Sequence, residues 1–216
     1  MKKILVLFFL FITFSAFAQP HIKGGLEAFI KSNLVYPPYS LQNCLEGNVT
    51  IAFKLTKNGE VYQSSVQSGI GTDLDDEALR LIRRSTGKWI MPAGYDTSLV
   101  VLAPVNFKLE GYNCANRTRA DRQRAIAAYQ ASEGLTQAIL NFYKNKEAGN
   151  FKKEEEARFL QLKKELGYDQ AFMERKIADG MKKLKQNDKQ GACEDFQFVK
   201  HMGFDLADQH IKKYCP

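Results

Sequence analysis

The stretch NVTIAFKLTKNGEVYQSSVQS, residues 48–68, decides the fold. Its first half alternates apolar and polar side chains, which is the period of a strand with one buried face. The apolar positions are Val49, Ile51, Phe53 and Leu55. Asn58-Gly59 follows, and this dipeptide readily adopts the positive φ values of a tight hairpin turn. We therefore expect the chain to return antiparallel from Val61 to Ser68.

An amphipathic helix is expected next. Thr72 can cap its N-terminus, acidic residues fill the first turn and arginines fill the last, which matches the helix dipole at both ends. Its apolar stripe consists of Leu74, Ala78, Leu81 and Ile82. We expect this stripe to cover the apolar face of the first strand.

The flanking segments add a short helix and a third strand. A helix over residues 25–34 ends at Tyr36-Pro37-Pro38, because a residue before proline avoids the α region. Trp89 is expected to complete the core. Residues 98–110 alternate again and predict the third strand. Pro104 cannot donate to a ladder, so this strand should be an edge of the sheet.

Five short motifs mark this region: Tyr36-Pro37, Asn58-Gly59, Leu74-Asp75-x2-Ala78, Trp89-x2-Pro92 and Pro104-Val105-x-Phe107. Their order resembles the C-terminal domain of TonB proteins, a peptide-recognition module of the bacterial envelope, over about residues 25–110. The resemblance implies that a receptor segment adds as a further strand at the last strand of the sheet. The corresponding residues are Leu99, Val100, Val101 and Leu102. The other interpretation is a simply protected edge, blunted by Pro104, by Lys108 or by the helical half of the chain.

The resemblance does not extend to a complete energy transducer. TonB proteins keep an uncleaved inner-membrane helix and cross the periplasm on a long proline-rich spacer. This chain has only six prolines and begins the TonB-like region almost directly after its N-terminal apolar segment. Force transmission from an inner-membrane motor is therefore not expected.

The N-terminus has the features of a secretory signal peptide. Lys2 and Lys3 precede an apolar run over residues 4–14, and Ser15-Ala16-Phe17-Ala18 forms a small-residue cleavage site before Gln19. The rival interpretation is an uncleaved anchor, but the run is shorter than the roughly 20 residues of a membrane-spanning helix. We expect cleavage after Ala18 and a periplasmic or secreted protein. An anchored protein of the inner membrane is the alternative.

After Gly111 the strand patterns stop. The rest of the chain predicts helices near residues 120–131, 135–146, 152–166, 170–184, 190–201 and 206–214. From Ile177 onward the spacing of small and apolar residues resembles one tetratricopeptide-type repeat. The expected division is a signal peptide (1–18), a TonB C-terminal-like α+β domain with a three-stranded antiparallel sheet (19–111) and an all-α helical-hairpin domain (112–216).

Four cysteines allow three disulfide pairings in an exported chain. We favour Cys44 with Cys114 and Cys193 with Cys215, because each pair then closes a loop that flanks regular structure, with Cys114 in the linker directly after the first expected domain. Neither pair has the C-x2-C spacing of a zinc site or a redox motif. The cysteines are therefore expected to be structural.

Composition and motifs argue against catalysis and against nucleic acid. The net charge is +7, but basic and acidic residues are interleaved in the C-terminal half, which indicates a solvated helical surface. No local motif combines a nucleophile with a base, a set of metal ligands or a phosphate loop. We therefore predict no catalytic, metal or cofactor residues and no small-molecule substrate. An enzyme whose residues converge only in three dimensions is a third interpretation.

The function that the sequence predicts is non-enzymatic binding of a protein or peptide partner in the envelope. The resemblance suggests a segment of an outer-membrane receptor as that partner. The alternative is a TonB-type energy transducer subunit, anchored by its uncleaved N-terminal helix and serving receptor-dependent transport. The two functions differ in whether residues 4–20 stay on the protein.

Overall fold

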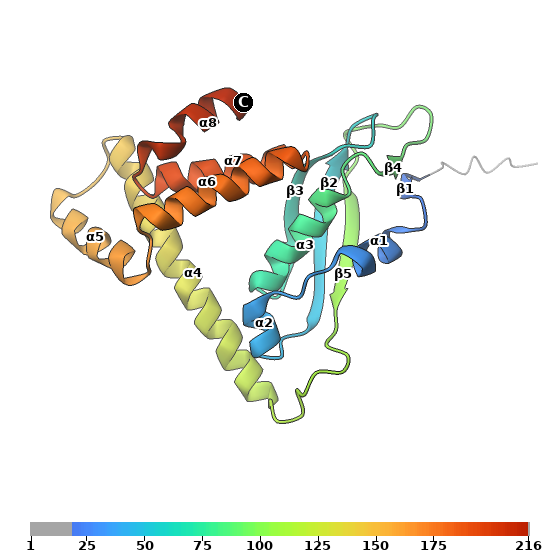
Figure 1. Cartoon of the computed structure of the whole chain (residues 1–216), viewed down its shortest axis with the longest axis horizontal. Helices are drawn as coiled ribbons and strands as arrows, with labels where there is room; N and C mark the ends of the chain where they lie inside the picture. The colour runs from blue at the N-terminus through green and yellow to red at the C-terminus, as the bar shows by residue number, and fades with distance from the viewer. Residues whose placement is uncertain (1–18, 216) are drawn as a thin grey trace, which may run out of the picture.

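The computed structural model describes residues 19–215, so the expected signal peptide lies outside the described residues. The first half of the chain forms two small antiparallel sheets and three helices (Figure 1). In chain order the elements are β1 (His21–Ile22), α1 (Leu26–Asn33), α2 (Pro38–Gln42), β2 (Gly47–Leu55), β3 (Val61–Ser68), α3 (Asp73–Arg84), β4 (Trp89–Ile90) and β5 (Val101–Phe107). The larger sheet has the order β3-β2-β5, and β1 pairs with β4 in the smaller one.

The expected hairpin joins β2 and β3, but its turn is longer than the dipeptide predicts. Gly59 adopts a φ of 74°, whereas Asn58 is not among the described residues with positive φ. The Gly59 N–H donates to the Thr56 carbonyl at 3.0 Å, which is typical of a three-residue loop with a bulge. A Cβ atom at Gly59 would also clash with the Trp89 carbonyl oxygen. Glycine is therefore required here both by conformation and by space.

Helix α3 covers one face of the three-stranded sheet, as its apolar stripe predicts. Leu74, Ala78, Leu81 and Ile82 are fully buried, and so are the alternating apolar residues of β2. Thr72 caps the helix by accepting a hydrogen bond from the Leu74 N–H. Trp89 joins the same core, and its ring is tilted by 50° against the Phe53 ring with centroids 5.4 Å apart. The first half is therefore a two-layer α+β unit built on one continuous core.

The second half is helical. It contains α4 (Arg119–Glu147), a 3-10 turn at Lys153–Glu155, α5 (Glu156–Glu165), α6 (Gln170–Lys185), α7 (Lys189–His201), a 3-10 turn at Asp205–Ala207 and α8 (Asp208–Tyr214). The prediction of separate helices on either side of Gly134 is wrong, because the 29-residue helix α4 runs through this glycine without a break. One interior glycine costs a helix only about 1 kcal/mol. A capping box between Thr118 and Asp121 starts the helix one residue before the expected position.

Helix α4 belongs to both halves of the molecule. Near its start, Ala125 and Ile126 pack against the sheet core, and the Tyr39 hydroxyl donates to the Ala125 carbonyl at 2.6 Å. Near its end, Ile139 belongs to a second core made with α6 and α7, and Leu140 and Tyr143 pack against that core. Figure 1 shows this helix running diagonally from below α2 to the helical half. The two halves are thus joined by a shared helix as well as by the chain connection.

Candidate functional site

The outer edge of β5 is the first candidate site. β2 is the one strand that pairs with β5 within residues 19–215, from Gly47 opposite Phe107 to Phe53 opposite Val101. The strand begins at Val101, later than the expected residue 98, and so contains only two of the four predicted site residues. Leu99 and Val100 lie between a turn at residues 97–98 and the start of the strand. The expectation that the proline-containing strand is an edge is confirmed.

The turn before β5 is held by hydrogen bonds. The Ser98 hydroxyl and N–H donate to the Asp96 carboxylate at 2.7 and 2.8 Å. These bonds hold the pKa of that exposed carboxyl below its usual value. The Leu99 N–H donates to the Asp96 carbonyl at 3.3 Å. Leu99 and Val100 therefore enter the strand from an ordered turn.

The predicted residues form an exposed apolar group. Leu99, Val100 and Leu102 have 53%, 57% and 59% of their surface exposed, although large apolar side chains are usually buried. Val101 differs, because its side chain packs against the sheet core. The inward positions farther along β5 are fully buried: Ala103, Val105 and Phe107. The structure thus places apolar surface beside a strand edge at its N-terminal end.

The register shows which backbone groups face the free edge. Ser64 of β3 directs both its N–H and its carbonyl away from β2, toward Gln190. Because a trans peptide points its N–H and carbonyl in opposite directions, Ser65 then faces Ala52 across the β2–β3 ladder. Alternation along β2 turns Phe53 toward Val101 and leaves the Leu102 N–H pointing outward. The missing N–H of Pro104 falls on the same outer side.

The opposite edge of the sheet is covered by the helical half. Gln190, at the start of α7, accepts the Ser64 N–H on its Oε1 at 2.8 Å and donates from its Nε2 to the Ser64 carbonyl at 2.8 Å. Beside this contact, Arg83 of α3 makes two charge-assisted hydrogen bonds with Glu194 of α7, at 2.7 and 2.8 Å. Figure 1 shows the α6–α7 hairpin reaching β3, on the far side of the sheet from β5. Sequence reasoning missed this contact, since 126 residues separate Ser64 and Gln190.

Of the motifs that carry the TonB resemblance, Pro104-Val105-x-Phe107 lies within β5, and residues of the other motifs position the sheet. Asp75 accepts the N–H groups of Ile70 and Gly71, both at 2.9 Å, which fixes the turn between β3 and α3. The Tyr36 ring meets Phe107 edge to face, with centroids 5.9 Å apart. Burial, together with the nearby Glu46 carboxylate, raises the pKa of the Tyr36 hydroxyl. These residues are therefore structural.

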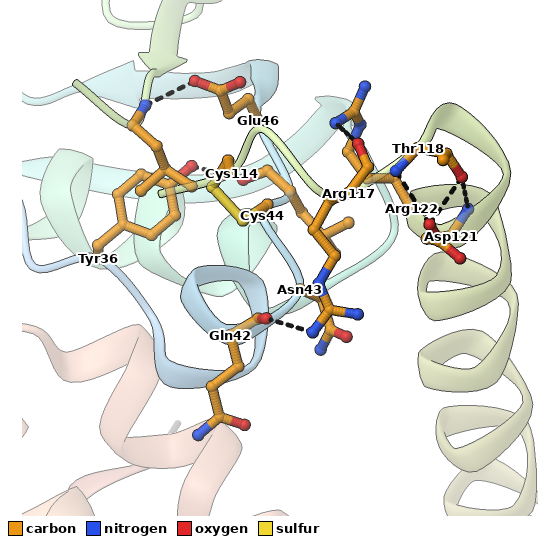
Figure 2. The surroundings of a disulfide bond; sticks show 12 residues. Tyr36, Gln42, Asn43, Cys44, Glu46, Cys114, Arg117, Thr118, Asp121 and Arg122 are labelled. Carbon is orange, nitrogen blue, oxygen red and sulfur yellow. Dashed lines mark hydrogen bonds between the residues drawn. A yellow bond between two sulfur atoms is a disulfide. The ribbon is translucent and has the colours of Figure 1, made fainter. Parts of the chain in front are cut away.

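A disulfide fixes the far end of β5 relative to α4 (Figure 2). Cys44 and Cys114 are bonded, and the Leu109 N–H donates to the Glu46 carboxylate at 2.6 Å nearby. On the other side of the bond, Arg117 donates to the Gln42 carbonyl at 3.2 Å. The bonded pair is the one favoured from the sequence. It anchors the segment between β5 and α4 against the α2–β2 loop.

The second favoured pair, Cys193 and Cys215, is also bonded and joins α7 to the C-terminal end of α8. No cysteine among residues 19–215 is left free. Within those residues no cluster of three or more His, Cys, Asp or Glu side chains is placed to hold a metal ion. The helices described there include none with the length and apolar character to cross a membrane.

Comparison with protein families supports the TonB resemblance. Residues 32–109 match the family model described as Gram-negative bacterial TonB protein C-terminal, which covers about a third of the chain. The match confirms the resemblance given for that region. Comparisons with curated proteins and with solved structures found no match. The tetratricopeptide-type resemblance of the tail stays a prediction.

Proposed function

We propose, from the match of residues 32–109 to the TonB C-terminal family, that this protein is an exported interaction module of the cell envelope. It binds an extended segment of a partner protein by strand addition at the outer edge of β5. The single observation that carries this proposal is the contrast between the two sheet edges. The helical half covers β3 through Gln190 and leaves Leu102 exposed on β5.

The physical basis of binding is the backbone of β5. An added strand gains main-chain hydrogen bonds at outward groups such as the Leu102 N–H, and affinity in this binding mode comes mostly from those bonds. The apolar side chains of Leu99, Val100 and Leu102 offer contacts to alternate side chains of the bound segment. The match to a protein-interaction domain favours binding over catalysis. The partner that this chemistry fits is an exposed, unpaired segment, as in an outer-membrane receptor.

The test compares proline and alanine at one position. Peptides covering the periplasmic segments of outer-membrane receptors from the native host are screened by fluorescence anisotropy. For any peptide that binds, Leu102→Pro should weaken affinity at least tenfold, because it removes an outward N–H. Leu102→Ala keeps that N–H and should weaken affinity less, through side-chain contacts alone. Equal affinity of wild type and Leu102→Pro would remove the β5 edge from the proposal.

A second candidate function is a TonB-type energy transducer, favoured by the apolar run over residues 4–14 together with the family match. It requires the N-terminal segment to remain as an inner-membrane anchor. The mass of the N-terminus and membrane fractionation from the native host decide between the two. A soluble chain starting at Gln19 supports the free module, and an intact Met1 chain in the inner membrane supports the transducer.

The division at residues 111 and 112 is part of the proposal. It follows the change from strands to helices along the chain. Because α4 packs into both cores, the two units should unfold together. A single cooperative transition, seen both by Trp89 fluorescence and by helical circular dichroism, would fit this arrangement.

A further inference from the structure

A cavity of about 650 Å³ lies against β3, on the covered side of the sheet. The edge of β3 from Val61 to Gln63 borders it on one side. Residues at the start of α7 and at the end of α8 border it on the other. Its volume falls in the range of roughly 300–1,000 Å³ that is usual for ligand sites, which often lie between structural units. The cavity is separate from the β5 edge.

The strand edge directs two peptide groups at this cavity that have no hydrogen-bond partner among residues 19–215. The Val61 N–H donates to Thr86 Oγ1 at 3.3 Å, and Ser64 meets Gln190, so both residues face away from β2. Between them, alternation of the ladder turns the Val61 carbonyl and the Gln63 N–H in the same direction. Gln63 has a φ of 49° and forms the bulge opposite Phe53. One acceptor and one donor are therefore directed at the cavity.

Gln190 shows what kind of group this edge accepts. Its side-chain carboxamide has the donor and acceptor of a peptide group, and it pairs with both backbone groups of Ser64 at 2.8 Å. The Ser64 hydroxyl also donates to the same oxygen at 3.0 Å. The carboxamide thus occupies the place that one peptide group of an added strand would take. The cavity continues this line of pairing along β3.

The charges around the cavity do not favour an anionic ligand. Arg83 is paired with Glu194, at 2.7 and 2.8 Å, and Asp188 accepts the Gly191 N–H at 2.7 Å. The remaining charged residues of the lining, Lys189 and Glu60, have opposite signs. Apolar surface is contributed by Val61, Tyr214 and the Cys193–Cys215 disulfide. The lining therefore suits an uncharged main chain that carries an apolar side chain.

We propose that this cavity is a second binding site, which takes a short, uncharged, extended peptide segment. The segment pairs with the Val61 carbonyl and the Gln63 N–H, in line with the Gln190 carboxamide. The site works independently of strand addition at β5, because the two edges lie on opposite sides of the sheet.

The test uses three capped peptides, acetyl-Val-Thr-Val-amide, acetyl-Leu-Thr-Leu-amide and acetyl-Tyr-Thr-Val-amide, titrated into the isotope-labelled protein with both disulfides intact. Because the backbone supplies the recognition, at least one peptide should bind with a millimolar Kd. The shifted amide signals should be those of Gln63 and Ser64, with no change at Leu102. An N-methylated version of the same peptide should bind at least fivefold more weakly.

Two tryptophan variants locate the site. Gln197 lines the cavity and is exposed, so Gln197→Trp fills the space and should weaken binding at least fivefold. Gln161→Trp makes the same change on the exposed surface of α5 and should leave binding unchanged. Lys189→Trp replaces Gln197→Trp if the latter fails to fold. No saturable shift with any of the three peptides, or equal binding by the cavity-filled variant, would overturn the proposal.

Removing Gln190 gives an independent measurement. Gln190→Ala frees the Ser64 N–H and carbonyl, which gives a longer peptide one more position to pair with. A capped tetrapeptide should therefore bind the variant at least threefold more tightly than it binds the wild-type protein. Unchanged tetrapeptide affinity would show that the peptide does not lie in line with Gln190. It would therefore contradict the proposed orientation.

Discussion

The two edges of the three-stranded sheet differ in what covers them. β3 meets α7 through the Gln190 carboxamide, beside the Arg83–Glu194 pair that joins α3 to α7. By contrast, exposed Leu99, Val100 and Leu102 lie at the start of β5, which has no paired strand on its outer side within residues 19–215. Edge strands are templates for pairing with other chains, and proteins commonly blunt them. Here a side-chain amide blunts one edge and the other stays available. The comparison indicates that the helical half covers β3 at Ser64 and leaves the whole outer edge of β5 open to an added strand.

The largest effects should come from the two disulfides, because one braces each side of the molecule. Cys44–Cys114 spans 70 residues and Cys193–Cys215 spans 22. By the chain-entropy model, removing them as Cys→Ser pairs should lower the free energy of unfolding by about 4 and about 3 kcal/mol respectively. Urea unfolding measures both values.

Mass mapping of the non-reduced protein is the control for this prediction. It should find only the two bridges given above. A bridge from Cys44 to Cys193 or Cys215 would contradict both the pairing and the two-unit division, and a bridge from Cys114 to either of them would contradict the pairing. If removal of Cys193–Cys215, which closes the shorter loop, lowered the free energy of unfolding more than removal of Cys44–Cys114, the chain-entropy explanation would be contradicted.

Proline substitution at neighbouring positions tests the direction of the β5 backbone. Val101 faces β2, so Val101→Pro removes a ladder hydrogen bond and should cost about 2–3 kcal/mol. The Leu102 N–H faces outward, so Leu102→Pro should cost under about 1 kcal/mol. Thermal and urea unfolding of both variants give the comparison. If Leu102→Pro were the more destabilising of the two, the Leu102 N–H would face β2 and the assigned direction would be wrong.

Much of this arrangement follows from the sequence, and the part that does not has a physical reason. The alternation in β2 and the stripe of α3 predict burial correctly, because both depend on local period and on one apolar face. Pro104 predicts an edge strand, because the missing N–H is a property of the residue itself. The covering of β3 is different, since a glutamine that pairs with a distant serine has no local signature. The Asn58-Gly59 dipeptide predicts the place of the turn but not its geometry.

The contact that covers β3 should make a smaller contribution to stability. Gln190→Ala leaves two backbone groups of Ser64 without their partner and should cost about 1 kcal/mol. Hydrogen exchange of the Ser64 amide should become faster in the variant. Gln197→Ala removes a glutamine from the same helix, where the structure gives it no hydrogen bond, and should change neither quantity. Unchanged Ser64 exchange in Gln190→Ala would show that the β3 edge is covered by other groups.

The smallest effect concerns carboxylates between the two halves. A cavity of about 520 Å³ separates α3 from α4, α6 and α7, and Asp76 and Glu133 both line it. Desolvation by the cavity walls raises the pKa of Asp76, although its side chain is exposed, and Lys176 acts in the opposite direction. Desolvation and then the charge of Asp76 raise the pKa of Glu133, which is also exposed, and Lys176 again opposes the change. Each carboxyl is therefore less acidic in the folded protein than in the unfolded chain, and the effect is small because both side chains are exposed.

A carboxyl whose pKa is raised on folding weakens the folded state once it ionises. Its penalty is fully present above the folded pKa and disappears as the pH falls from that value to the ordinary value near 4. Asp76→Asn and Glu133→Gln should thus stabilise the protein at pH 7, and the gain should vanish near pH 3. Urea unfolding over pH 3–7 measures the difference between each variant and wild type, which cancels opposing groups such as Asp121. A variant less stable than wild type at pH 7 would mean that attraction to Lys176 outweighs burial, and that the covered side of the molecule is held by charge.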